Sequence, residues 1–245
     1  MKTINDIVCV FRIQLMSMRA QAGPFFLAAL LFPAAMFLFA LAVSGDAARD
    51  ESRLRFLAGS IVFSLSLTSI SWLGYLLLEN RFTGRLKLFA TLPLAPASYI
   101  LGILVFAFAQ ALLGTTALIL VGRAFGVQAR PNILLLGLII LLTVLCLCGL
   151  GAVIAARARS FTEGSILTDA LGAGLVFLAP VYYTADRMPP TLGAVSRLLP
   201  TAFAARAVEA TLTGSYQVGG PLLALGLTAI VTLTLGFRLT KWRED

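Results

Sequence analysis

Hydroxyl side chains recur along one side of an apolar segment over residues 56–78. They belong to Ser60, Ser64, Thr68, Ser71 and Tyr75. A sparser pattern of small and polar residues marks the next apolar segment, at Gly102, Gln110 and Gly114. Such side chains can hydrogen-bond a solute that moves along the surface, or they can let apolar helices pack closely. The spacing is compatible with both interpretations.

Asp169 is the single acidic residue within a further apolar segment over residues 165–183. A carboxylate in such a place is unfavourable and normally faces protein or water. We expect it to pair with Arg157 or Arg159, to line an inner vestibule, or to lie within a turn or two of the membrane interface, where the cost of the charge is small. Candidate residues for a polar path through the protein are Ser64, Thr68, Ser71, Tyr75, Gln110 and Asp169.

Several kinds of catalytic chemistry are excluded by residue types. The chain has no histidine, which excludes a Ser-His-Asp triad and an H-E-x-x-H zinc site. A phosphate-binding loop needs a Gly-Lys pair, but Lys2, Lys87 and Lys241 follow Met1, Leu86 and Thr240. We therefore expect no enzyme activity, no metal site and no cofactor in this chain.

The composition is that of an integral membrane protein. Of 245 residues, 59% are hydrophobic and only 12% are charged. A membrane-spanning helix needs about 20 mostly apolar residues. The formal net charge of +8 fits basic cytoplasmic loops better than nucleic-acid binding, because little of the chain is left to face water. The predicted fold class is an all-α integral membrane protein with six transmembrane helices.

Apolar segments separated by polar residues give the order of the predicted elements. An amphipathic helix over residues 1–22 should lie in the membrane interface. The six spans are predicted at about 24–43, 56–78, 97–121, 132–156, 165–183 and 219–239. A charged loop over residues 44–55 separates the first two. Together they form a single transmembrane domain over 1–245.

The distribution of basic residues predicts the orientation of the chain. Six spans place both termini on one side. If that side is the cytoplasm, its segments hold the larger share of Lys and Arg, including every lysine. We expect both termini to be cytoplasmic.

The polar segment over residues 79–96 has the pattern of a short basic amphipathic helix. Phe82, Leu86 and Phe89 share one face at helical spacing, whereas Arg81 and Arg85 lie off that face. Such a helix can dock on a soluble partner, or it can be an interfacial turn that holds the flanking spans in place. Residue types alone favour neither.

The same segment resembles the permease subunits of type-2 ABC exporters, at Glu79, Gly84, Leu88, Thr91 and Pro93. In that family the segment is the coupling helix, which contacts the ATP-binding subunit. The family often has an acidic residue where this chain has Lys87. The resemblance implies that the residues that couple to the ATP-binding subunit are Glu79, Arg81, Thr83, Gly84, Arg85, Leu88 and Pro93.

A Pro-rich segment over residues 184–214 is also similar to the family. Met188-Pro189-Pro190, Leu198-Leu199-Pro200-Thr201 and Ala207-Val208-Glu209-Ala210 match its outer-face stretch, although Leu199 stands where Asn is usual. In the family this stretch forms re-entrant helices after the fifth span. The resemblance, with the amphipathic N-terminus, covers nearly the whole chain.

The resemblance implies the membrane subunit of an ATP-driven exporter in a bacterial or archaeal inner membrane. A second permease subunit, most simply a second copy, would complete the path through the lipid bilayer. ATP and Mg would be bound by a separate ATP-binding cassette subunit. Two other functions stay open: an ion-coupled secondary transporter, and a structural membrane subunit without transport. A neighbouring gene for an ATP-binding protein would favour the exporter.

Overall fold

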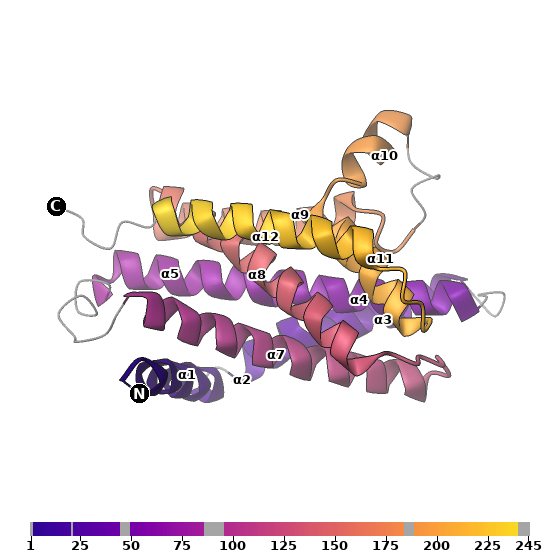
Figure 1. The fold of residues 1–245 in the computed structure, drawn as a ribbon, viewed down its shortest axis with the longest axis horizontal. Helices are drawn as coiled ribbons and strands as arrows, with labels where there is room; N and C mark the ends of the chain where they lie inside the picture. The colour runs from indigo at the N-terminus through magenta and orange to yellow at the C-terminus, as the bar shows by residue number, and fades with distance from the viewer. Residues whose placement is uncertain (1, 21, 45–49, 86–95, 184–188, 240–245) are drawn as a thin grey trace.

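The computed structural model of the chain describes residues 2–20, 22–44, 50–85, 96–183 and 189–239. All regular structure in these ranges is helical, which confirms the all-α prediction. Figure 1 shows long helices running side by side, with the short α10 projecting from the bundle. The helices are α1 (Lys2–Ala20), α2 (Ala22–Phe26), α3 (Phe32–Ser44), α4 (Asp50–Ser66), α5 (Trp72–Phe82), α7 (Pro96–Ala124), α8 (Ile133–Arg157), α9 (Phe161–Leu178), α10 (Pro190–Ser196), α11 (Pro200–Leu212) and α12 (Gly219–Leu239), with π-helical turns η1 (Leu27–Leu31) and η2 (Leu67–Ser71).

Within the described ranges, five helices are long and apolar enough to cross a membrane. They are Asp50–Phe82, Ala97–Ala124, Ile133–Arg157, Phe161–Leu178 and Gly219–Gly236. The first predicted span corresponds to a shorter apolar helix, Ala29–Ser44. The count of six spans therefore stays a prediction, whereas a multi-pass membrane protein is established.

Two predicted boundaries are wrong. The fifth span was expected at 165–183, but the helix is Phe161–Leu178 because Ser160 caps it. Ser160 Oγ accepts from the Glu163 backbone N–H at 3.1 Å, which is one half of a capping box, and Glu163 Oε2 accepts at 2.9 Å from the N–H of Arg159, the residue before the N-cap. Residues 44–55 were expected to be a loop, but α4 already begins at Asp50.

The longest helical run, α4–η2–α5, is the centre of the bundle. Ile61, Leu65 and Ile70 are fully buried along it. Its π-helical turn lies in a stretch rich in hydroxyl residues, where side chains compete for backbone carbonyls. Thr68 Oγ1 donates to the Ser64 carbonyl at 2.7 Å, and Ser66 Oγ donates to the Gly172 carbonyl of α9 at 2.8 Å. The polar groups of this segment thereby tie α9 to the central helix.

Glycines bring α8 close to its neighbours. A Cβ on Gly151 would lie 2.7 Å from the Ile70 carbonyl oxygen of η2. A Cβ on Gly149 would lie 2.7 Å from the carbonyl carbon of Thr232 in α12. Both obstacles are backbone atoms, so α8 contacts η2 and α12 at a separation that no larger residue permits.

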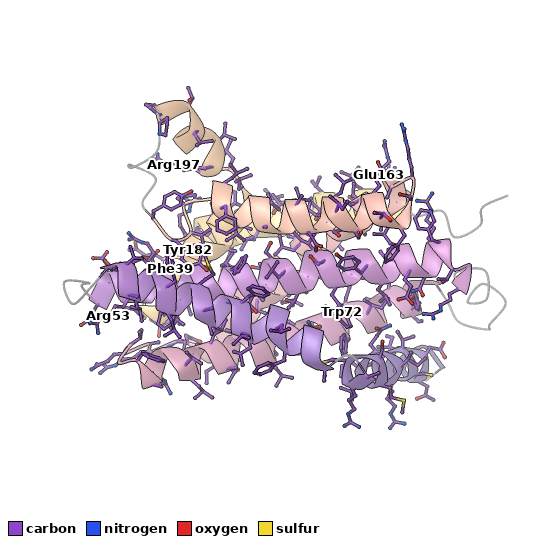
Figure 2. All side chains as sticks on the ribbon, turned by 180° about the vertical axis from the view of Figure 1, so that it is seen from behind. Phe39, Arg53, Trp72, Glu163, Tyr182 and Arg197 are labelled. Atoms are coloured by element: carbon purple, nitrogen blue, oxygen red, sulfur yellow. The ribbon has the colours of Figure 1, made fainter. Side chains whose placement is uncertain are left out.

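The helix α1 lies crosswise to the bundle. In Figures 1 and 2 it is seen foreshortened, while α7, α8 and α12 are seen along their length. Val10 of α1 packs on Gly102 of α7, and the rings of Phe11 and Phe106 meet edge to face at 5.8 Å. This orientation suits the interfacial position predicted for residues 1–22, which stays a prediction.

The segment that was expected to be re-entrant forms two short helices, α10 and α11, in its described part. Pro190 and Pro200 begin them, as proline suits the first turn. Thr201 Oγ1 donates to the Leu175 carbonyl of α9 at 2.6 Å, and Arg55 Nε of α4 lies 3.0 Å from Glu209 Oε1. These contacts attach α11 to the end of the bundle where α4 begins.

Candidate functional site

The chain leaves the central helix at Thr83, the C-cap of α5. The Thr83 N–H and its hydroxyl both donate to the Glu79 carbonyl, at 2.9 and 2.6 Å. Gly84 follows with φ +73°, a left-handed conformation that glycine adopts without strain. The sequence therefore ends α5 with a defined change of direction, which lies within the predicted coupling segment over residues 79–96.

An ion pair lies on the exposed surface at this turn. Arg85 Nη1 is 2.8 Å from Glu79 Oε1, and the two side chains are 55% and 44% exposed. An exposed pair of this kind adds little stability. Both charged groups remain accessible from outside the chain.

Arg81 points the other way, into the bundle. Its Nη1 donates to the carbonyls of Ala155, Ala156 and Ala158 at 3.1, 3.2 and 3.0 Å. These oxygens belong to the C-terminal end of α8, where carbonyls lack helical partners and a positive charge is favourable. The expected contact of Arg81 with the ATP-binding subunit stays a prediction, and within the chain Arg81 connects the ends of α5 and α8.

Part of the predicted coupling segment lies outside the described residues. This part holds Leu88 and Pro93, with Lys87 and Thr91 of the same motif. The described members of the motif, Glu79 to Arg85, are brought together at one end of the bundle. Asn80, which follows Glu79 in the sequence, is buried. Its side-chain amide donates to the hydroxyl of Tyr99 and so positions α7 against α5.

Three of the predicted path residues are buried. Ser64 Oγ donates to the Ala29 carbonyl at 2.6 Å, and Thr68 is turned back on its own helix. Gln110 is 3% exposed, and in the described part of the chain neither of its amide atoms has a hydrogen-bond partner. In the single chain, these three side chains serve helix packing and line no open surface.

The other three form a cluster where η2 and α5 lie against α9. Asp169 accepts hydrogen bonds from Ser71 Oγ at 2.8 Å and from the Tyr75 hydroxyl. Pairing with Arg157 or Arg159 was one expectation for this aspartate, but among the described residues it is bonded to these two hydroxyls instead. Figure 2 looks onto the face where α9 lies along α4 and α5, with Glu163 at one end and Tyr182 near the other. Asp169 is exposed on α9.

Two aromatic residues that contact the central helix were not predicted from the sequence: Phe161 lies beside this cluster, and Tyr182 lies away from it. The ring of Phe161 lies 6.3 Å from that of Tyr75, and Phe161 is 41% exposed. Tyr182 shares a hydrogen bond with Ser60 at 3.3 Å near the other end of α9. Neither residue carries a sequence signal, because the contacts join segments far apart in the chain.

The family of the chain follows from comparison with known proteins. A search of curated proteins found no match. A family model described as ABC-2 type transporter matches residues 7–213. The match begins within α1, includes every candidate residue named above and ends just after α11. The chain is an ABC transporter permease and belongs to the ABC-2 type transporter family.

Proposed function

We propose that the chain is the membrane subunit of an ATP-driven exporter, powered by a separate ATP-binding subunit that binds ATP and Mg. The observation that carries this proposal is the exposed Glu79–Arg85 pair, held by a capped turn at the end of the central helix. Hydrolysis belongs to the partner, and this chain performs no catalysis. The membrane is the inner membrane of a bacterium or archaeon, with both termini in the cytoplasm.

The geometry supports transmission of a conformational change from the docking surface to the membrane-spanning helices. The helical run Asp50–Phe82 is 33 residues long, which corresponds to about 50 Å at the rise of an α-helix. Arg81 connects its end to the end of α8, and Ser66 connects its middle to α9. Movement of the turn at Thr83 therefore displaces three helices together.

A second permease subunit, most simply a second copy, completes the path. The face formed by α9, α5 and α4 carries the exposed Asp169, whereas the lipid-facing side of α12 carries Leu223, Leu227 and Ile230. A carboxylate is far less favourable against lipid than an apolar side chain. The copies therefore meet across the Asp169 face, with the path between them.

Co-purification tests the proposal. The tagged chain is isolated from membranes of its natural host in mild detergent, as the natural sequence, as Arg85→Glu and as Arg130→Glu. Arg130 is an exposed arginine at the opposite end of the bundle and serves as the control. The natural chain and Arg130→Glu should recover a protein with a phosphate-binding loop, and Arg85→Glu should not. Recovery of no such protein with the natural chain would contradict the proposal.

A further inference from the structure

Asp169 lies in the middle of a membrane-spanning helix. It follows Phe161 by eight residues in α9, a helix of 18 residues. At the rise of an α-helix this is about 12 Å from the first residue. A carboxylate at that depth needs a partner or a water-filled path, and an intramembrane ionisable residue marks a functional site.

The contacts of Asp169 leave its charge uncompensated. Ser71 and Tyr75 donate neutral hydroxyl groups to its two oxygens. Among the described residues, ion pairs join Arg55 to Glu209 and Arg85 to Glu79, and none joins Asp169 to an arginine or lysine. The hydroxyls hold the carboxylate in one orientation but do not neutralise it. The carboxyl group of Asp169 is therefore placed to bind a positively charged group that the described part of the chain does not supply.

Two aromatic rings lie near the Asp169 carboxylate, one from Phe161 at the start of α9 and one from Tyr75. The ring of Tyr75, whose hydroxyl touches Asp169, lies 6.3 Å from the ring of Phe161 at an interplanar angle of 41°. Aromatic faces attract cations and bind apolar groups at the same time. A carboxylate beside aromatic rings is suited to organic cations, whose charge is spread over an apolar body. One carboxylate and two hydroxyls are too few oxygen ligands for Ca²⁺, which takes six to eight.

We propose that Asp169, Tyr75 and Ser71 recognise a positively charged group of the cargo, and that the cargo is an amphipathic organic cation. The inference rests on the proposed function, because it places this cluster in the path between two permease copies. Asp169 holds the charge, Ser71 and the Tyr75 hydroxyl orient the carboxylate, and the rings of Tyr75 and Phe161 contact the apolar body. A neutral or anionic cargo of the same size binds less well at this site.

The test is equilibrium binding of radiolabelled tetraphenylphosphonium to the purified full-length chain in detergent. Tetraphenylborate, of the same shape and opposite charge, is the control ligand. Glu163→Gln, which removes another carboxylate of α9, is the control variant. Asp169→Asn should weaken phosphonium binding about tenfold or more, as loss of one contact to a charged group does. Glu163→Gln should leave phosphonium binding unchanged, and the natural chain should bind tetraphenylborate only weakly.

Equal phosphonium binding by the natural chain and Asp169→Asn would overturn the proposal. So would dissociation of paired copies in Asp169→Asn with unchanged phosphonium binding, because Asp169 would then contact the second copy. If Asp169→Asn does not fold, Tyr75→Leu should bind phosphonium more weakly than Tyr75→Phe, and equal binding by these two variants overturns the proposal. Recovery of the ATP-binding subunit is measured on the same preparations. If phosphonium binding is unchanged in Asp169→Asn but the ATP-binding subunit is still recovered, only the cargo proposal has failed and the proposed function stands.

Discussion

The guanidinium of Arg81 lies 3.0 Å from the carbonyl oxygen of Ala158, and so joins the last turn of α5 to the end of α8. Four residues later, Arg85 is turned outward to the exposed Glu79. Two arginines of one short motif thus have opposite environments. One holds helices together inside the bundle, and the other is available at the surface. Substitutions at the two positions should therefore have separable effects.

Arg81→Ala should destabilise the protein, and Arg85→Ala should not. Loss of the Arg81 contacts leaves three carbonyls at the end of α8 without their charged donor, which should lower the free energy of unfolding by about 2 kcal/mol. The Glu79–Arg85 pair is exposed, so its loss should change the free energy by less than about 1 kcal/mol. Thermal unfolding in detergent compares the two variants. Equal destabilisation would contradict the different environments of the two arginines.

Gly151→Ala should destabilise the contact between α8 and η2. The added methyl group would lie 2.7 Å from the Ile70 carbonyl oxygen, a backbone atom that cannot move alone, so the expected loss is about 1–3 kcal/mol. Gly137→Ala in the same helix is the control, because no described atom lies within 4 Å of the added carbon. Thermal unfolding should separate the two variants. A stable Gly151→Ala protein would show that α8 is not packed this tightly.

The contribution of Glu209 to the free energy of unfolding should fall as the pH rises from the ordinary carboxyl pKa to the raised pKa of this residue. Burial raises the pKa of Glu209, although the charge of Arg55 and its hydrogen bond oppose that rise. A carboxyl with a higher pKa in the folded than in the unfolded chain binds its proton more tightly when folded. The free energy of unfolding is therefore greatest below the ordinary pKa and decreases until the raised pKa is passed.

Comparison with Glu209→Gln isolates this effect. The melting temperature in detergent is measured from about pH 3 to 8, a range that begins below the ordinary pKa values of carboxyl groups. The decrease with rising pH should be smaller in Glu209→Gln than in the natural chain. An unchanged pH dependence in the variant would mean that Glu209 does not contribute to it.

Much of the fold was predictable because apolar segments and charge-free stretches report directly on the bilayer. The helices predicted at 97–121, 132–156 and 219–239 agree closely with α7, α8 and α12. The start of α9 was missed although Ser160 and Glu163 carry a capping-box spacing in the sequence. The sequence therefore contains a local signal for the start of this helix.

The site was less predictable, because its contacts join distant parts of the chain. Asp169 was recognised as unusual, but its partners lie 98 and 94 residues away in Ser71 and Tyr75. The hydroxyl pattern identified these two residues together with Ser64 and Thr68, which are buried. The packing of α9 and α3 decides which side of the central helix is open. The periodicity of the central helix alone does not contain that information.

Crosslinking from Thr83 tests the proposed docking surface most directly. A photoreactive phenylalanine derivative is placed at Thr83 or, as the control, at Thr213, and membranes of the natural host are irradiated. Both threonines are exposed helix C-caps followed by a glycine of positive φ, but Thr213 ends α11 at the other end of the bundle. We expect Thr83 alone to give a crosslink to a protein with a phosphate-binding loop. A crosslink to that protein from Thr213 would contradict docking at the end of α5. The absence of a crosslink from both positions would contradict it as well.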